Sequence, residues 1–484
     1  MKLKTMISRF VTRDVPAMID TRDGKRKYSY DEVLLSGLAP SGGLFVPDKY
    51  PKITHRQLEE LKDKKYIDIA FTVKRLFTGT AFTDEELKSF IEKAYSKAKF
   101  DAYDGNITPL KQIDDKLFIQ NLSLGPTAAF KDMAMQLLAQ EMNFVLAKSG
   151  KNLSILGATS GDTGSSAEAA FKGLDRTKLL ILSPEKGMSE FQKAQMGALS
   201  GGNIFNISVK GRFDDCQDLV KKLKKESEFS HLGAVNSINW GRITSQVPYY
   251  FAGYLQAVNK IGEKVDFVVP SGNFGNVLSA YIAKQMGLPI RRLIVATNEN
   301  DVLHKLFATG VYELSPATVT SSPSMDISKA SNYERLLFDL FDKDSGKTAK
   351  YMQEFADKGR VDLRDYGISV DDLEGLGFVS GKSTHQDRLN AIRKVYDNSG
   401  FVIDPHTADA VHTAYNTRDN GVITIAMMTA LPVKFENTVK EALGFVPERP
   451  HRFANVEETA QNPDAFNVIN NDPEELRNIL RKYM

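Results

Sequence analysis

The chain has 484 residues, of which 42% are hydrophobic and 26% charged, a composition that excludes a disordered or fibrous protein. Because 63 Lys and Arg residues face 61 Asp and Glu residues, the net charge of +2 offers no general attraction for nucleic acid or for an anionic membrane. The single cysteine, Cys216, excludes an internal disulfide and favours a reducing compartment, so we expect a cytoplasmic protein. We also expect no transmembrane helix, since no apolar run approaches the roughly 20 residues that span a bilayer.

The first and last parts of the chain differ from its middle. Residues 1–100 contain a glycine turn and then charged amphipathic helices between His55 and Lys99, which predicts a separate N-terminal region. Residues 441–484 are predicted to form a C-terminal helical segment, in which Asp472 caps a helix beginning at Pro473.

The middle of the chain, 101–440, shows the pattern of an α/β core. Helical spacing of apolar residues between 214 and 225 and after two of the strands predicts intervening helices. Buried strands of a parallel sheet are predicted at 153–156, 178–182, 206–209, 265–269, 293–296 and 422–427.

One stretch superficially resembles a nucleotide-binding loop. Residues 375–383 (GLGFVSGKS) end in Gly-Lys-Ser, but their glycine spacing does not match a P-loop. We therefore predict an ordinary loop there, without a nucleotide.

Two glycine-rich loops are candidate anion sites. Residues 157–164 (GATSGDTG) and 271–276 (SGNFGN) each follow a predicted strand and precede a predicted helix. Glycines free the backbone, and hydroxyl groups with the helix N-terminus supply donors, so both loops suit a carboxylate or phosphate. An ordinary strand-to-helix turn remains the alternative for each loop.

Lys131 is a candidate catalytic lysine. It lies in an apolar neighbourhood after the Gly125-Pro126 turn, where desolvation would lower its pKa and free the amine for Schiff-base chemistry. From residue types alone, the alternative is a lysine whose stem packs while its ammonium group reaches water.

The run at 125–132 (GPTAAFKD) resembles the pyridoxal-phosphate lysine motif of the threonine synthases, which are fold-type-II pyridoxal-phosphate enzymes. The similarity extends from about residue 37 to residue 444. Further runs match in family order at 37–47, 159–164, 189–196, 236–242, 270–276, 322–327, 331–337, 404–408 and 429–435.

The resemblance implies an α/β fold with a parallel-sheet core in two lobes, the smaller at about 131–215, and with Lys131 in a Schiff base with pyridoxal 5′-phosphate. It places Thr429 at the pyridine nitrogen, where a hydroxyl makes the ring a weaker electron sink than a carboxylate would. The implied cofactor-binding residues are Lys131, Gly272, Asn273, Phe274, Gly275, Asn276 and Thr429. The implied substrate-binding residues are Thr159, Ser160, Asp162, Thr163, Asn239 and Arg242, the last two for a phosphate. No metal ion is implied.

The activity implied is conversion of O-phospho-L-homoserine and water to L-threonine and phosphate by a monomer or homodimer, with Lys131 as the base at Cα. The alternatives are a phospholyase that releases the ketoacid without hydrating Cβ, a serine or threonine dehydratase, and a non-catalytic binding protein. Leu124 and Leu431 stand where the family has histidines, and Ser41 where it commonly has an acid. We expect the two leucines to face each other beside the cofactor.

Overall fold

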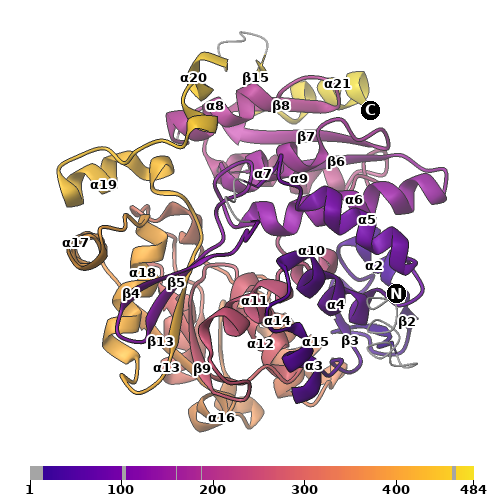
Figure 1. The fold of residues 1–484 in the computed structure, drawn as a ribbon. Helices are drawn as coiled ribbons and strands as arrows, with labels where there is room; N and C mark the ends of the chain where they lie inside the picture. Colours follow the sequence, from indigo (N-terminus) through magenta and orange to yellow (C-terminus); the bar gives the residue numbers. More distant parts are fainter. Residues whose placement is uncertain (1–14, 101–104, 160, 187, 460–464) are drawn as a thin grey trace.

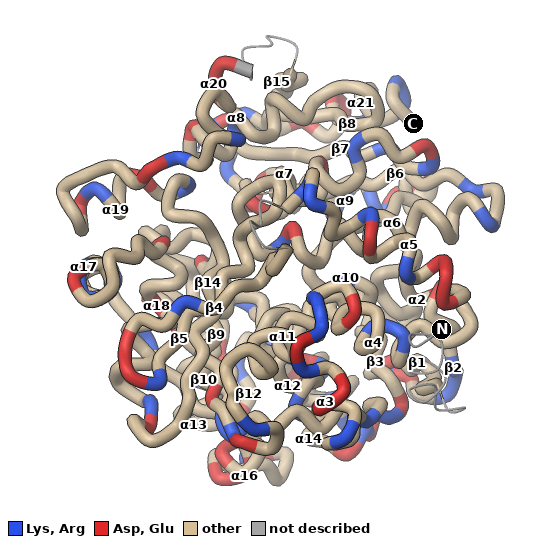
Figure 2. Tube along the Cα trace, in the orientation of Figure 1, with Lys and Arg blue, Asp and Glu red and all other residues tan. Residues whose placement is uncertain are grey.

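The computed structural model describes residues 15–100, 105–159, 161–186, 188–459 and 465–484. Two sheets form separate lobes, and the small sheet lies above the large one in Figure 1. Positive and negative residues are nearly equal in number, and Figure 2 shows them interspersed over both lobes. Within the described part of the chain, no helix is both long enough and apolar enough to span a bilayer.

The large lobe is built on a six-stranded sheet whose pairings are parallel except for that of β4 with β5. Its strands in spatial order are β13 (Phe378–Lys382), β10 (Ile290–Thr297), β9 (Val265–Pro270), β14 (Thr424–Met428), β5 (Leu117–Asn121) and β4 (Leu110–Asp114). Strands β9 and β14 are buried along their whole length, which explains their continuous apolar runs. The predicted strands at 265–269, 293–296 and 422–427 are confirmed.

Both faces of the large sheet are covered by helices. Alternate residues of β9 and β14 pack into two different hydrophobic clusters, one on each face. The covering helices are α11 (Val247–Ala257) and α12 (Gly275–Gln285) on one face, and α17 (His385–Ser399) and α18 (Pro405–Thr417) on the other.

The small lobe contains a four-stranded, wholly parallel sheet. Its strands in order are β15 (Phe466–Asn470), β8 (Ile204–Lys210), β7 (Thr177–Pro184) and β6 (Leu153–Ala158). The three predicted strands are confirmed. The helices around this sheet are α6 (Lys131–Lys148), α7 (Asp162–Phe171), α8 (Glu190–Leu199), α9 (Phe213–Lys224) and α21 (Pro473–Tyr483).

The C-terminal segment is not purely helical as predicted, because β15 adds a strand beside β8. β15 is an edge strand with mostly half-buried or exposed side chains, so it lacks the apolar run of a central strand. The predicted cap of α21 is confirmed: the Asp472 carboxylate accepts a hydrogen bond from the Glu474 N–H at 2.9 Å.

The N-terminal region packs against the core. Buried Lys74 of this region donates to the Gly241 carbonyl at 3.1 Å and pairs with Glu141 at 3.2 Å. Its elements are β1 (Met18–Asp20), β2 (Lys27–Tyr28), α2 (Tyr30–Ser36), β3 (Phe45–Pro47), α3 (His55–Leu61), α4 (Tyr66–Thr78) and α5 (Asp84–Ala94). The predicted helices between His55 and Lys99 are confirmed.

The stretch at 375–383 corrects a prediction. Its residues Phe378–Lys382 form the edge strand β13, paired in parallel with β10, and not a loop. The strand is only partly buried, so its Ser-Gly-Lys end carries no apolar signal.

The remaining elements connect the two sheets and cover the large lobe. They are α10 (Trp240–Thr244), α13 (Val302–Thr309), β11 (Val311–Glu313), η1 (Pro323–Met325), α14 (Tyr333–Leu340), α15 (Ser345–Lys358), β12 (Arg360–Asp362), η2 (Leu363–Tyr366), α16 (Val370–Gly375), η3 (Pro432–Phe435), α19 (Glu436–Leu443), η4 (His451–Phe453) and α20 (Val456–Thr459).

Candidate active site

Lys131 is the first residue of α6, and the loop before it is fixed at both ends. The Asp132 carboxylate accepts from the Thr127 N–H at 2.8 Å and from the Thr127 hydroxyl at 2.6 Å. The Phe130 N–H donates to the Thr429 carbonyl at 2.8 Å, which joins the loop to the end of β14. Lys131 therefore lies where the carboxyl end of the large sheet meets the small lobe.

The surroundings of Lys131 favour the neutral form of its amine. Its side chain is only 13% exposed, and burial lowers its pKa below the ordinary value. The nearby carboxylate of Asp162 opposes this shift, while the positive charges of Arg242 and Lys434 reinforce it. A lysine with a lowered pKa is the kind that forms Schiff bases.

Asp162, at the start of α7, is the centre of the polar contacts. Its Oδ2 lies 3.5 Å from Lys131 Nζ, and its Oδ1 lies 2.6 Å from Lys434 Nζ. Gln192 donates to Oδ1 and Ser324 to Oδ2, each at 2.9 Å. Burial alone would raise the pKa of Asp162, but Lys434 and Lys131 hold it well below the ordinary value, so the group is ionised.

Ser324 is held in place by a buried histidine. The Ser324 N–H donates to Nε2 of His406 at 3.0 Å, and Nδ1 of His406 lies 2.9 Å from Oδ1 of Asp404. Because Nε2 accepts a hydrogen bond, the proton of a neutral ring is on Nδ1, and this N–H donates a hydrogen bond to Asp404.

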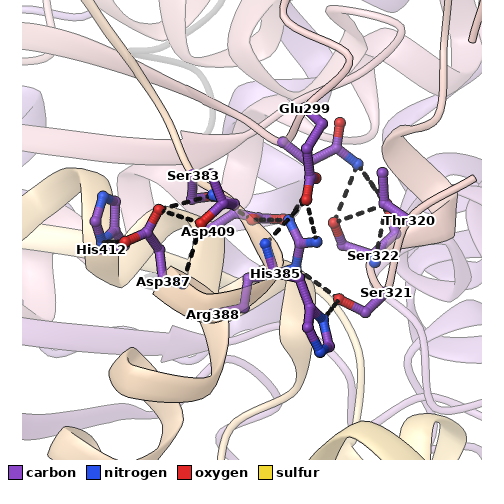
Figure 3. Close-up of polar contacts among 12 residues, drawn as sticks. Glu299, Thr320, Ser321, Ser322, Ser383, His385, Asp387, Arg388, Asp409 and His412 are labelled. Carbon is purple, nitrogen blue, oxygen red and sulfur yellow. Dashed lines mark hydrogen bonds and ion pairs between the residues drawn. The ribbon is translucent and has the colours of Figure 1, made fainter. Parts of the chain in front are cut away.

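A second network anchors the segment just before Ser324 (Figure 3). Arg388 donates to the Ser321 hydroxyl at 2.7 Å and forms a two-point pair with Glu299 at 2.9 Å for each contact. It also lies 3.1 Å from Asp409, which accepts a hydrogen bond from Ser383. Burial raises the pKa of Asp409 to about 6, against the opposing effects of Arg388 and Ser383.

The loop at 271–276 has the geometry of a phosphate cradle. It follows β9, Phe274 adopts a left-handed conformation at φ 63°, and α12 begins at Gly275. Oδ1 of Asn276 accepts from the hydroxyls of Tyr249 at 3.0 Å and Tyr250 at 2.6 Å. The Asn276 Nδ2 group is buried and has no hydrogen-bond partner among the residues that the structure describes.

The glycines of this loop are packed differently. A Cβ on Gly272 would lie 2.8 Å from Ile327 Cγ1 and 3.1 Å from Met325 Cα. A Cβ on Gly275 would meet nothing closer than Nδ2 of Asn332 at 3.3 Å. The Asn273 carbonyl accepts from the Asn332 N–H at 3.1 Å, which fixes the loop from the side of α14.

These residues fit pyridoxal phosphate. Lys131 offers a buried amine of lowered pKa, and Asn276 offers an unsatisfied amide donor at the start of a helix. Thr429 directly follows β14 and is 8% exposed, at the predicted position on the strand end.

Asn239 and Arg242, the two residues predicted to bind the substrate phosphate, differ in how far their hydrogen-bonding groups are used within the protein. Both ends of the Asn239 amide are engaged, since Nδ2 donates to the Leu34 carbonyl and Oδ1 accepts from the Gly241 N–H, each at 2.9 Å. Arg242 makes one long hydrogen bond, to the Val235 carbonyl at 3.4 Å, and its buried Nε has no partner in the described parts of the chain. Burial lowers the pKa of Arg242 to about 10, so it stays charged at neutral pH.

The loop at 159–164 is shaped by Thr159. Its hydroxyl oxygen accepts from the N–H groups of Gly161 at 3.0 Å and Gly164 at 2.8 Å. Thr163 is half-buried at the start of α7, and Ser160 lies outside the described residues.

Leu124 and Leu431 both adjoin η4. Arg452 donates to the Leu124 carbonyl at 2.7 Å, and Leu431 packs on the cluster that contains Phe453. The Ser41 hydroxyl donates to Asp20 at 2.7 Å. That the two leucines face each other stays a prediction.

The sequence analysis assigned no role to several residues at the centre of the site. Each lies in a run that matches the family, so the motifs themselves were the available signal. These residues are Gln192, Ser324, His406 and Lys434.

Comparisons with known proteins show the family of the chain. Family models match for the threonine synthase N terminus at 17–95, a pyridoxal-phosphate dependent enzyme at 104–372 and the threonine synthase C-terminal part at 407–480. The threonine synthase of Methylobacillus glycogenes is 44% identical over 479 residues, 96% of this chain and 99% of the relative. That of Corynebacterium glutamicum is 45% identical over 448 residues, 90% of this chain and 92% of the relative.

A solved structure shows the same similarity. The threonine synthase from Brucella melitensis with bound pyridoxal phosphate has a TM-score of 0.90 and 38% identity, covering 97% of this chain and 99% of that one. The predicted fold class and cofactor are confirmed. The chain belongs to the threonine synthase family of pyridoxal-phosphate-dependent enzymes.

Proposed function

We propose that the protein converts O-phospho-L-homoserine and water to L-threonine and phosphate. The observation that carries this proposal is a buried lysine of lowered pKa, Lys131, whose charged form is disfavoured by the buried guanidinium of Arg242, and the Nε of that guanidinium has no hydrogen-bond partner among the described residues. The first suits covalent chemistry on an amino acid, and the second suits a phosphate on that amino acid.

Lys131 would hold the cofactor covalently, and the loop at 271–276 would hold its phosphate. Of the loop residues, Asn276 offers its unsatisfied Nδ2, while Gly272, Asn273, Phe274 and Gly275 supply backbone. The Thr429 hydroxyl would contact the pyridine nitrogen. Pyridoxal phosphate supplies an electron sink that eases loss of the proton from Cα of the substrate.

Lys131 is the proposed base. Once the substrate amine has displaced it, its free amine takes the proton from Cα and then carries protons to and from Cβ. Burial lowers the pKa of this amine, which favours the unprotonated form that can accept a proton.

The substrate is held at two ends in this proposal. The Arg242 guanidinium binds the phosphate, and Asn239 supports it by capping α10, the helix that carries Arg242. Thr159, Ser160 and Thr163 surround the substrate carboxylate. Asp162, being ionised, accepts hydrogen bonds only, so it acts on Lys131 and not as a donor to a carboxylate.

The remaining properties are proposed from charge and composition. The balanced charge fits a small-molecule substrate rather than nucleic acid, and the buried single thiol of Cys216 fits the cytoplasm. We propose a monomer or homodimer as the working form.

Product analysis tests this function. Purified protein is incubated with O-phosphohomoserine, and both phosphate and the organic product are identified, with Lys131→Ala as the inactive control. L-Threonine and phosphate in equal amounts are expected. Phosphate with 2-oxobutanoate and no threonine would replace the proposal with a phospholyase.

A further inference from the structure

Lys434 is a buried charged residue for which the proposed reaction gives no role. It lies in η3, the short helix that follows Thr429 in the chain, and its side chain is fully buried. Its ammonium group lies 2.6 Å from Oδ1 of Asp162 and donates to the Thr127 carbonyl at 2.9 Å. It thus joins η3 of the large lobe, α7 of the small lobe and the loop that leads into Lys131.

Two buried lysines compete for one carboxylate. Lys434 lies 2.6 Å from Asp162, while Lys131 makes a longer ion pair with it at 3.5 Å. The Asp162 carboxylate also accepts hydrogen bonds from Gln192 and Ser324. The negative charge of Asp162 is therefore already compensated when Lys131 approaches it.

Other charged or titratable groups surround this pair. Arg242 also disfavours the charged form of Lys131. Asp132, the next residue after Lys131, accepts two hydrogen bonds from Thr127 and interacts with the charge of Lys434. His406 accepts a hydrogen bond from the Ser324 N–H, and its ring packs against Phe435 of η3 with the ring centroids 4.7 Å apart.

We propose that Lys434 is a positioning residue that takes up the charge of Asp162, and so leaves the Lys131 amine neutral and free to react with the cofactor aldehyde. Only an unprotonated primary amine attacks an aldehyde; a C=N bond forms, and the aldehyde oxygen leaves with both amine hydrogens as one water molecule. This inference rests on the proposed role of Lys131.

The test measures the rate at which the full-length protein, freed of cofactor, binds added pyridoxal phosphate at a series of pH values, followed by visible absorbance. Removing Lys434 leaves Asp162 to pair with Lys131 and to stabilise its ammonium form. In Lys434→Gln, the pH midpoint of the rate should rise by about one unit, which slows binding by about tenfold at pH values below the wild-type midpoint. Lys434→Arg keeps the charge. Its binding rate should stay within about threefold of wild type, and the pH midpoint of the rate should shift by well under one unit.

Ser324→Ala covers the case in which Lys434→Gln does not fold. It removes a hydrogen bond to the Asp162 oxygen that faces Lys131, and it should shift the midpoint in the same direction by a smaller amount. The inference would be overturned if Lys434→Gln folds and keeps the wild-type midpoint. If Lys434→Gln does not fold, the same result for a folded Ser324→Ala would overturn it.

Borohydride reduction and peptide mapping separate this inference from the proposed function. A pyridoxyl group on Lys131 in the wild type and the variants keeps the assignment of the cofactor lysine, whatever the midpoint does. A pyridoxyl group on Lys434 in the wild type would overturn the proposed function and the inference together.

Discussion

Ser324 of the large lobe donates a hydrogen bond from its hydroxyl to Asp162 of the small lobe, at 2.9 Å. The two residues are 162 positions apart in the chain. The contact places a hydroxyl beside the oxygen that faces Lys131, so the reactive end of the site is completed only where the lobes meet.

Replacing His406 tests the support of Ser324. His406→Leu should destabilise the protein by about 2–4 kcal/mol, because it leaves the buried Ser324 N–H without its acceptor and removes the ring contact to the Asp404 carboxylate. Denaturant unfolding measures this loss. His412→Leu on the same helix, at a site where the side chain is 24% exposed, should cost under about 1 kcal/mol. Equal losses for the two variants would contradict the role given to His406.

Gly275→Ala tests the phosphate cradle. The nearest protein atom to the new Cβ would be 3.3 Å away, so the fold should tolerate it, while the backbone can no longer approach a phosphate closely. We expect cofactor affinity to fall by about tenfold or more, about 1.4 kcal/mol, with an unfolding midpoint near that of wild type. Titration with pyridoxal phosphate checks this, and unchanged affinity would mean that the phosphate is bound elsewhere.

Gly272→Ala is the contrasting variant. Its Cβ would meet Ile327 at 2.8 Å and the Met325 backbone, so this change should lower both stability and affinity. A stable Gly272→Ala protein would show that the neighbouring segment can move aside.

Arg242→Met tests the substrate phosphate site. The variant should keep its bound cofactor and fold, while KM for O-phosphohomoserine rises by about tenfold or more, because a two-point guanidinium contact to phosphate is lost. Steady-state kinetics measures the change. The matched control is Arg335, whose guanidinium donates to the Phe45 carbonyl, Asn332 and the Ile238 carbonyl and has a structural role. Arg335→Met should lower stability, and a KM change confined to Arg335→Met would contradict the assignment.

Asp409 predicts a pH dependence of stability. Its pKa in the folded protein is about 6, above the unfolded value of about 3.9, so the folded state binds more protons in this range and stability falls as pH rises through it. The contribution of Asp409 to the free energy of unfolding should decrease by about 2 kcal/mol between pH 4.5 and pH 7 and stay constant above pH 7. Asp409→Asn removes the titration. The difference in unfolding free energy between wild type and this variant should therefore change by that amount, and a constant difference would refute the shift.

The sequence determined the elements whose signal is local. Continuous apolar runs predicted central strands such as β9, because both faces of a central parallel strand are buried and each residue reports it. The proline and aspartate at 472–473 predicted the start of α21 for the same local reason. The run around Lys131, together with the further runs that match in family order, indicated the family and its cofactor, because each run consists of consecutive residues.

Only the tertiary structure decided which groups act together. Lys131, Asp162, Ser324 and Lys434 lie on four elements, and their approach depends on how two lobes pack, which no local pattern records. The edge strands β13 and β15 escaped prediction because a strand buried on one side carries too few apolar residues. Arg242 and Arg335 are the same residue type in matching runs and both are buried, but their hydrogen bonds differ: the Arg335 guanidinium donates to carbonyls of the fold, while Nε of Arg242 has no partner among the described residues.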